Sequence, residues 1–531
     1  MSGSLIQLVA KGIHDNYLIS EPEITFFKIV YRRHTNFAVE SIRQNFLSDP
    51  KFGKSISCDI SNSGDMVYKI FIYIEIPSIP KFSDNINKFA WVKNLGYAMI
   101  KDISIEIGGK VIDRQYGEWL YIWSELNNTK QIGLNKMIGN IPDIYEFSNG
   151  KKSYGMYVPL EFWFCKNIGS SIPIVSLNKS SIKLNITFQE FQKCCRTGPT
   201  HYIELLDPIS SINNYDYIEF NIDDVLNKGY VIEFDFLSKR LYYIDLLMDT
   251  NYKYEKHNND IFYTNDTNTF NPTPVNPVFD KNFDKLINTD TIQQTIYTIT
   301  NPVNGITTKA KNNPIKINNE NILDSDLSFK SYIYIDYIYL DKVEREKIMN
   351  TNSDNLIEQI QMVEYTNIID QKIGYNLPFK HPCKEFFWIA QLDNIVGENT
   401  INDVFNYTTS PYRKDNGYGE LLGNNLISTT GLTINSNNRF GPLPGKYTNY
   451  VLPYQQHNSS PPTGINIYPF SLFPADIQPS STLNLSKIDT TQIQFILDSV
   501  VDKMNVVKIR IYVLNYNILR VFMSNIALVF D

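Results

Sequence analysis

The sequence predicts an all-β protein made of two large antiparallel domains, either sandwiches or barrels. Apolar and polar residues alternate in many short segments that Gly, Pro, Asn and Asp interrupt, whereas helical spacing is scarce. The chain has 531 residues, and a single core stops growing at roughly 250 to 300 residues. These observations favour two pairs of antiparallel sheets over one parallel sheet wound with helices.

The clearest strand signal begins at Met66. One face of this segment consists of isoleucines that alternate with aromatic and charged residues: Ile70, Ile72, Ile74 and Ile76. A second signal spans residues 103–112 and has Gly108-Gly109 at its centre, where two glycines supply the positive φ angles of a tight turn. We therefore expect a strand over 66–76 and a hairpin over 103–112.

Three further segments read as strands. Residues 182–188 and 232–236 alternate in the way that half-buried antiparallel strands do. Residues 331–340 differ, because apolar and aromatic side chains occupy both faces and Asp336 alone interrupts them. We expect this last strand to be covered on both sides.

Helices are predicted in three short connectors. Apolar residues recur at three- and four-residue intervals over 119–126 and at four-residue intervals over 5–17. A third helix is expected to begin at Asp341, whose carboxylate can cap it while Glu344 reaches back to the Asp341 amide.

Two stretches lack this alternation. Residues 251–326 are rich in Asn, Thr and Asp and contain five prolines, and residues 399–462 are similar. Such a polar segment cannot be buried without leaving backbone groups unpaired, so we expect 251–326 to be a long surface insertion that a short linker could replace at little cost in stability. The apolar pieces 296–299 and 315–317 predict partial order within it.

The charge balance argues against nucleic acid as a direct partner. The chain has 49 Lys and Arg against 56 Asp and Glu, a net charge of −7, whereas duplex-binding proteins present a basic face to the phosphates. Five irregularly spaced cysteines are too few for a disulfide framework, so a reducing setting is expected. We expect no signal peptide, and no apolar run is long enough to span a bilayer.

The motifs that carry enzyme chemistry are missing from the sequence. It contains no GxSxG, HExxH or CxxC pattern, and neither 441–447 nor 417–423 matches a phosphate or dinucleotide loop. The six histidines are scattered singly, and the adjacent Cys194 and Cys195 would point to opposite faces of a strand. We therefore predict that the chain is not an enzyme and has no catalytic residues, no metal ligands and no cofactor. Carboxylate pairs such as Asp223-Asp224 leave a glycosidase reading open.

Two kinds of surface site stand out. Of the Asn-x-Ser/Thr sequons in this asparagine-rich chain, three are candidate glycosylation acceptors, Asn265, Asn406 and Asn458. The basic cluster Tyr31-Arg32-Arg33-His34 either pairs with carboxylates of a neighbouring subunit or solvates a strand end. Both readings remain open.

Several motifs together resemble one family. The run from Glu23 to Phe37, EITFFKIVYRRHTNF, is similar to the N-terminal signature of the double jelly-roll major capsid proteins of nucleocytoplasmic large DNA viruses. Further similar segments are 103–109, 116–119, 159–165, 337–341, 356–359, 464–468, 478–480 and 515–520. The resemblance covers nearly the whole chain. The stretch 201–327, which is longer than usual, and the C-terminal residues 526–531 depart from the family pattern.

The resemblance implies two tandem jelly-roll β-sandwiches. The expected organisation is an N-terminal arm (1–24), a first jelly roll (25–341) with the insertion at about 251–326, a linker helix (342–352) and a second jelly roll (353–531). It further implies a structural major capsid protein that forms pseudo-hexameric homotrimeric capsomers in an icosahedral shell. Such capsomers contact one another, minor capsid proteins and an internal membrane, in a virion capsid assembled in the host cytoplasm.

Further expectations concern the two ends of such a capsomer. The insertion is expected on the capsid exterior, and the apolar stripe of residues 5–17 is expected to face the interior. Two alternatives remain. One is a specialised or minor capsid paralogue; the other is a carbohydrate-binding or carbohydrate-cleaving β-sandwich, motivated by the 35 Tyr, 31 Phe and 5 Trp.

Overall fold

The computed structural model describes residues 35–127, 131–177, 180–206, 212–222, 225–246, 252–257, 260–265, 297–302, 305–317, 328–396, 401–410, 423–522 and 525–530. The predictions for residues 1–34, which include the helix over 5–17 and the basic cluster, lie outside these described residues.

The first sandwich consists of two four-stranded antiparallel sheets. One sheet contains, in spatial order, β1 (Phe37–Asn45), β19 (Lys330–Leu340), β3 (Met66–Ile76) and β7 (Tyr154–Pro159). The other contains β2 (Ser55–Asp59), β8 (Ile182–Phe188), β5 (Ile100–Ile107) and β6 (Lys110–Gln115). If the eight strands of this sandwich are numbered 1 to 8 in chain order, with β19 as the eighth, one sheet has the order 1-8-3-6 and the other has the order 2-7-4-5. This is the jelly-roll order.

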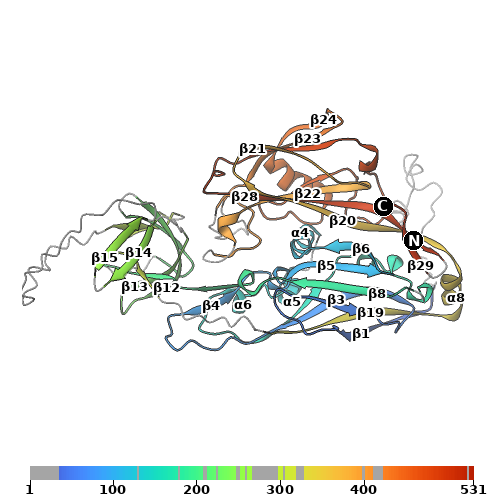
Figure 1. Cartoon of the computed structure of the whole chain (residues 1–531), viewed down its shortest axis with the longest axis horizontal. Coiled ribbons are helices and arrows are strands. Elements are labelled where there is room, and N and C mark those ends of the chain that lie inside the picture. The colour runs from blue at the N-terminus through green and yellow to red at the C-terminus, as the bar shows by residue number, and fades with distance from the viewer. Residues whose placement is uncertain are drawn as a thin grey trace, which may run out of the picture.

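The second sandwich repeats this order. Its first sheet contains β20 (Ser353–Ile368), β28 (Val507–Phe522), β22 (Pro382–Leu392) and β25 (Asn466–Pro469), with β26 (Leu483–Asn484) and β29 (Asn525–Leu528) added beside β22 and β28. Its second sheet contains β21 (Lys372–Asn376), β27 (Thr491–Leu497), β23 (Ile427–Ile434) and β24 (Asn437–Pro444). The predicted double jelly roll is therefore confirmed, and the four sheets lie one above another (Figure 1).

Most predicted strands and turns lie where the alternation placed them. The exception is 232–236, which is only the end of β12: the strand bulges between Val231 and Glu233, and Phe236 lies beyond it and is exposed. β3 has the bounds expected from its isoleucine face, and Gly108 and Gly109 form the β5–β6 turn with φ of 60° and 83°. The equivalent β23–β24 turn uses Asn435 and Ser436 at φ of 46° and 65°. Both turns have the two positive φ angles of a tight hairpin, although the second has no glycine.

Short helices connect the strands. The α-helices are α3 (Leu95–Ala98), α4 (Gly117–Asn127), α5 (Gln131–Met137), α6 (Pro142–Tyr145), α7 (Trp163–Lys166), α8 (Lys342–Asn350) and α9 (Leu452–Gln456). The π-helix η6 (Tyr447–Val451) runs directly into α9, and the 3-10 turns are η1 (Ile168–Ser170), η2 (Ile174–Ser176), η3 (Phe191–Lys193), η5 (Asp393–Ile395) and η7 (Leu485–Lys487). Half of the predicted cap of α8 is present, because the Asp341 carboxylate accepts a hydrogen bond from the Glu344 amide at 2.9 Å. The other half is wrong, because the Asp341 amide donates to the Asn36 carbonyl oxygen rather than to Glu344.

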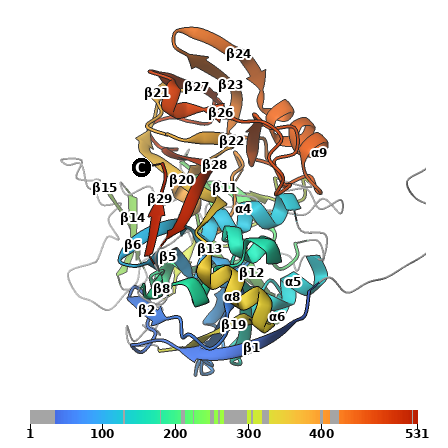
Figure 2. The same cartoon turned by 90° about the vertical axis from the view of Figure 1, so that its right-hand side faces the viewer.

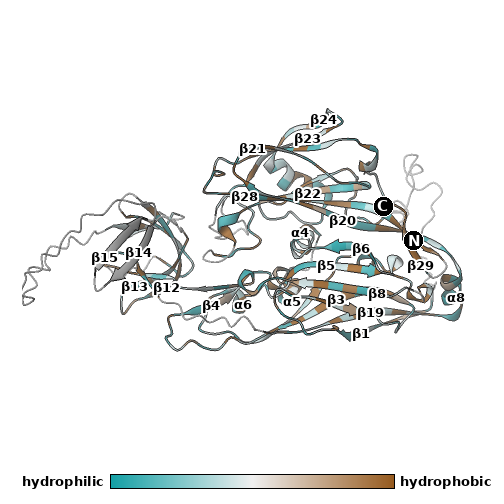
Figure 3. Cartoon of the chain, viewed as in Figure 1, coloured by the Kyte–Doolittle hydropathy of each residue, from teal (hydrophilic) through white to brown (hydrophobic). Residues whose placement is uncertain are grey.

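Hydrophobic and hydrophilic residues alternate along the strands of the sandwiches (Figure 3), and the buried hydrophobic residues form cores. Buried and less buried residues alternate along β3, β8 and β19, whereas β22 and the centre of β28 are buried on both faces. The prediction that residues 331–340 are covered on both sides is wrong for the single chain. Ile333, Ile335 and Tyr337 face the core, but Tyr332 and Tyr334 lie on a partly exposed face.

A third sheet emerges between β8 and β19, at the end of the molecule away from α8 (Figures 1 and 2). Its spatial order is β17 (Thr307–Lys309), β16 (Thr298–Thr300), β11 (Tyr217–Ile222), β12 (Val225–Asp235), β13 (Arg240–Asp245), β10 (His201–Glu204) and β18 (Ile315–Lys316). Two strand pairs lie beside these sheets, β4 (Lys88–Trp91) with β9 (Cys195–Gly198), and β14 (Tyr252–His257) with β15 (Asp260–Asn265).

The third sheet shows that part of the predicted insertion is a folded sheet rather than a surface loop. The strands that leave the first sandwich begin near residue 201 rather than 251, and the polar stretch contributes β16, β17 and β18 to a sheet with its own core. The expected order at 296–299 and 315–317 is present as β16 and β18. A polar segment can do this because a few residues, such as Ile299 and Ala310, are fully buried.

Two deletions should therefore behave differently. Replacing 251–296 by a Gly/Ser linker removes β14 and β15, which pair with each other, and should leave the third sheet intact. Replacing 251–326 also removes Ile299, and should lower amide protection in β11 by at least ~2 kcal/mol, the cost of losing one buried isoleucine. Hydrogen exchange of the β11 amides distinguishes the two deletions, and the β3 amides serve as the internal reference. Equal protection of β11 in both deletions would mean that β16 does not stabilise the third sheet.

Candidate functional site

The described residues offer little for catalysis. They contain no group of three or more His, Cys, Asp or Glu side chains that could hold a metal ion. The five cysteines are buried free thiols, and burial raises the pKa of Cys58 to about 11. Within the described residues, no helix combines the length and the apolar character needed to cross a membrane. The buried charged clusters lie instead in the contact between the sandwiches.

Helix α4 carries the aromatic part of that contact. It follows β6 and lies between the two sandwiches (Figure 1). The Trp119 ring meets Phe387 edge-on with centroids 4.9 Å apart, and Tyr121 stacks on Phe405 at 4.3 Å. The helix begins tightly against the first sandwich, because a Cβ on Gly117 would lie 2.0 Å from the Tyr97 carbonyl oxygen.

Beside these rings lies a charged network centred on Glu118. Its carboxylate pairs with Arg510 at 2.6 Å and accepts hydrogen bonds from the hydroxyls of Tyr512 at 2.6 Å and Tyr407 at 3.1 Å. Arg510 also pairs with Glu364. Burial, and then the Glu118 charge, raise the pKa of Tyr512 well above its usual value, so this hydroxyl acts as a donor.

A second charged cluster joins α7 to the second sandwich. Glu358 of β20 pairs with Lys166 at 2.8 Å and with Lys384, whose side chain is fully buried. Burial opposes ionisation of Glu358, but the two lysines outweigh it and lower its pKa below the ordinary value. The carboxylate is therefore ionised at neutral pH.

His457 forms a third polar contact at the same interface. Its Nδ1 lies 3.0 Å from Asn127 Oδ1 and its Nε2 lies 3.1 Å from Glu385, and the side chains of His457 and Glu385 are fully buried. One ring thus bridges the end of α4 in the first sandwich to β22 in the second.

Asp113 bridges β6 to β20. Its Oδ1 accepts a hydrogen bond from the Ile360 amide at 2.9 Å, and its Oδ2 accepts one from Gln115 Nε2 at 3.2 Å. Burial raises the pKa of Asp113 to about 7, although these hydrogen bonds act in the opposite direction. Gln115 Oε1 has no hydrogen-bond partner among the described residues.

The shift of Asp113 predicts a pH dependence. Its folded-state pKa lies above the ordinary value of 3.8, so the folded chain binds more protons than the unfolded chain between pH 4 and 7, and stability falls as the pH rises through that window. Asp113→Asn should therefore gain stability relative to wild type from pH 5 to pH 8, by on the order of 2 kcal/mol. Urea midpoints at both pH values measure this; exposed Asp59→Asn is the control, and parallel pH profiles would contradict it.

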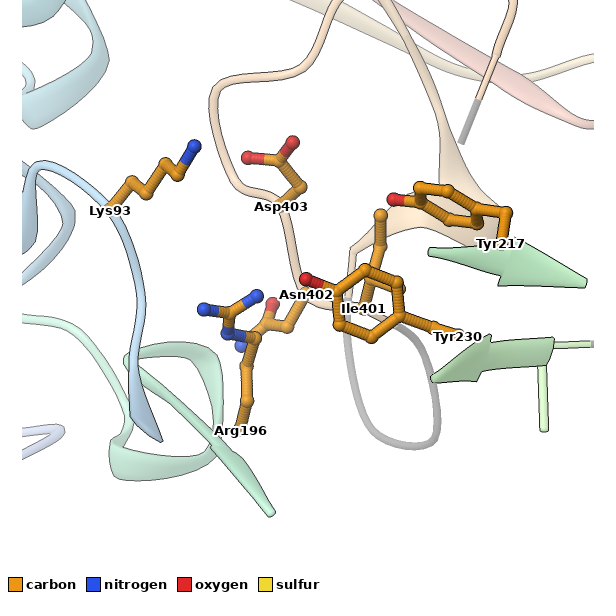
Figure 4. A pocket seen from close by; sticks show the side chains of 7 residues that line it. All are labelled: Lys93, Arg196, Tyr217, Tyr230, Ile401, Asn402 and Asp403. Atoms are coloured by element: carbon orange, nitrogen blue, oxygen red, sulfur yellow. The ribbon is translucent and has the colours of Figure 1, made fainter. Parts of the chain in front are cut away.

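A small pocket lies at the end of the molecule away from α8, where the two sandwiches and the third sheet meet (Figure 4). Its lining includes Lys93 and Arg196 from the β4–β9 pair and the connection after β4, Tyr217 and Tyr230 from the third sheet, and residues 401–403 from the second sandwich. Asn402 Nδ2 donates to the carbonyl oxygens of Cys195 at 2.9 Å and Gln192 at 3.1 Å. These bonds hold the second sandwich against η3 and β9.

The three candidate glycosylation residues differ in accessibility. Asn406 is fully buried; its Nδ2 donates to the Ser410 carbonyl, and its Oδ1 accepts from the Thr408 amide and hydroxyl. The folded chain therefore does not present this sequon, and its choice as an acceptor is corrected. Asn458 is exposed beside α9, and the Asn265 side chain lies outside the described residues.

Sequence reasoning did not identify the interface residues. Glu118 lies next to Trp119 in a helix whose apolar spacing was recognised, but a single glutamate in such a helix is normally solvated. Lys384 and Glu385 gave a usable signal, because they interrupt the otherwise apolar strand PCKEFFWIAQL. Adjacent opposite charges in a fully buried strand indicate partners on both faces.

Two tandem jelly rolls joined by a broad buried contact define a structural protein of the double jelly-roll class. Comparison with known proteins is consistent with this class. The family model for the N-terminus of major capsid proteins matches residues 25–226, and the model for large eukaryotic DNA virus major capsid proteins matches residues 344–527. The chain belongs to this capsid protein family, as its N-terminal signature predicted, and its place is the virus capsid.

Individual relatives agree with the family models. "Probable capsid protein 4" of Acanthamoeba polyphaga mimivirus is 44% identical over all of this chain and 99% of that protein. The "Major capsid protein" of Phaeocystis pouchetii virus is 26% identical over 98% of both chains. The Faustovirus major capsid protein structure shares the fold, with a TM-score of 0.62 and 11% identity over 96% of this chain and 94% of that one.

Proposed function

We propose that this chain is a major capsid protein that assembles as a homotrimer with six similar lobes, and that these capsomers tile an icosahedral shell. The observation that carries the proposal is the repeat within the chain. Two sandwiches of identical strand order are stacked in the same sense, so the stack ends in unlike sheets, β1-β19-β3-β7 and β21-β27-β23-β24. Unlike ends suit a head-to-tail ring, and three chains of two lobes make a ring of six.

The proposal includes the neighbours of the capsomer. The third sheet, on the end away from α8, would face the exterior. The end that carries α8 would face minor capsid proteins and an internal membrane, because α8 itself exposes the apolar residues Val343 and Met349. We propose no direct nucleic-acid contact, no catalysis and no cofactor, with assembly in the host cytoplasm. Asn458 is the acceptor we would test for glycosylation.

The test is the mass of the purified chain in solution. One chain has a mass of 61.5 kDa, and light scattering in chelator and reductant should give a stable trimer. Dilution should not separate it, since a contact that persists through assembly should bury a few thousand Å². A persistent monomer would contradict the proposal, and a trimer that dissociated in chelator would reveal a metal site.

A second role is favoured by one observation. The chain is 44% identical to "Probable capsid protein 4" of the mimivirus but 27% identical to "Capsid protein 1" of the same virus. A specialised capsid paralogue would follow from that difference. Quantitative mass spectrometry of purified particles separates the roles, because a major capsid protein would dominate the particle and a paralogue would be a small fraction of it.

A further inference from the structure

The two sandwiches are covered unequally within the chain. In the second sandwich, β22 is buried on both faces, and so is the central part of β28. The topologically equivalent strands of the first sandwich, β3 and β19, bury one face and leave the other partly exposed. The sheet with the order 1-8-3-6 is therefore covered on its outer face in the second sandwich and uncovered on that face in the first.

Two elements of the first sandwich cover this face of the second sandwich. They are β6, the edge strand of its sheet, and α4, the helix that follows β6. Strand β6 contacts β20, where Asp113 accepts from the Ile360 amide, and α4 places Trp119 on Phe387 and Glu118 on Arg510. In strand order, β6 and α4 are the fifth strand and the helix that follows it. Their equivalents in the second sandwich are β24 and the helical segment η6–α9, residues 447–456.

This helical segment presents an apolar stripe to solvent. Tyr447, Val451 and Tyr454 are exposed and follow each other at four and three residues, so they lie on one face. Tyr454 is 80% exposed. Leu452, by contrast, packs into the core between the sandwiches. Figure 2 shows α4 between the two sandwiches and α9 at the side of the second one.

The uncovered sheet of the first sandwich presents a cluster of aromatic rings, here called the tyrosine face: Tyr73, Tyr157, Tyr332 and Tyr334. Tyr73 stacks on Tyr332 with centroids 4.4 Å apart and meets Tyr157 at 4.9 Å, and the Arg43 guanidinium lies 3.7 Å from the Tyr332 centroid. Gly155 leaves room for this layer, because a Cβ there would lie 2.5 Å from the Tyr73 hydroxyl. Tyrosine and arginine are enriched in protein interfaces.

We propose that in the homotrimer the stripe Tyr447, Val451 and Tyr454 of one chain packs on the tyrosine face of the next, as α4 packs on β22 and β28 within one chain. The inference rests on the proposed trimer and assigns its contact surfaces. The partner is a second copy of this chain, because each chain carries both the stripe and the tyrosine face. Within one chain the equivalent surfaces, α4 and the face of β22 and β28, are already in contact. It also accounts for the two-faced apolar pattern of residues 331–340, one face of which stays uncovered in the single chain.

The contact is heterologous, so two complementary variants test it. The first, Val451→Asp with Tyr454→Asp, disables the stripe and keeps the tyrosine face. The second, Tyr157→Asp with Tyr334→Asp, disables the tyrosine face and keeps the stripe. The control is Met504→Asp, at a residue that is 79% exposed in the β27–β28 connection, on neither surface. Circular dichroism first establishes that all three variants fold.

Sedimentation velocity then gives the assembly state. Each double variant alone should be monomeric, with trimer affinity weakened at least 100-fold, while the control stays trimeric. An equimolar mixture of the two should form a one-to-one heterodimer and nothing larger, because it contains one intact pair of surfaces and no way to close the ring.

The other results overturn the inference or the proposal beneath it. A monomeric wild type would refute the trimer itself. A trimeric wild type with trimeric double variants would refute these surfaces while leaving the trimer standing. Homodimers of either variant alone would mean that like surfaces meet. A mixture that stays monomeric would mean that the stripe does not bind the tyrosine face. Either result would refute the head-to-tail contact.

Discussion

Glu118→Ala is expected to destabilise the protein by about 3 kcal/mol, because it leaves Arg510, whose side chain is only 21% exposed, beside the buried Tyr512 and Tyr407 without its main counter-ion. Glu364 still pairs with Arg510, but its side chain is 37% exposed and less able to compensate. The shift of the urea midpoint at pH 7 measures the loss. Near the interface, the amides of β28 should lose most protection from hydrogen exchange.

Two further variants control this result. Glu346→Ala on the exposed surface of α8 should change stability by less than ~0.5 kcal/mol. Glu118→Leu combined with Arg510→Met removes both charges and should recover much of the loss, since buried ion pairs are replaceable by apolar groups of similar size. If Glu118→Ala were no worse than Glu346→Ala, the network would have no part in holding the sandwiches together.

Glu358→Gln is expected to have the second large effect, about 3 kcal/mol at pH 7, because Lys166 and the fully buried Lys384 then lack a carboxylate. The pH dependence has a definite sign. The lowered folded-state pKa of Glu358 means that its contribution is present above its unfolded-state pKa and is lost as the pH falls through the folded value. The Gln variant should therefore lose part of the acid sensitivity of the wild type.

The matched control lies on the same strand. Asp354 of β20 pairs with Arg520 at 2.7 Å, but both side chains are about half exposed, at 49% and 51%. Asp354→Asn should cost at most ~1 kcal/mol, since exposed ion pairs contribute little. Urea titrations at pH 7 and pH 4 compare the two variants. Equal losses at pH 7 would mean that burial of the Glu358 cluster does not matter.

Much of the fold follows from local pattern. The isoleucine face of β3 and the Gly108-Gly109 turn place a strand and a hairpin, because period-two burial and positive φ are set within a few residues. The limits appear where partners are distant. Glu118 and Arg510 are 392 positions apart in the chain, so nothing near either residue predicts their pairing.

The insertion shows the same limit. Its short apolar pieces were recognised, but the sheet that uses them pairs β16 with β11 and β18 with β10, across long gaps in the sequence. The two-faced pattern of residues 331–340 was also recognised, yet its second face has no cover within one chain. A strand pattern reports that a face is apolar without identifying what covers it.

The most direct test of the central claim is an electron-microscopic image of the purified protein viewed down its symmetry axis. Three chains, each with two stacked sandwiches of the same strand order, should appear as a ring of six lobes around a threefold axis, with the third sheets forming three projections at one end. Isolated two-lobed particles, or a dimer related by a twofold axis, would contradict the account.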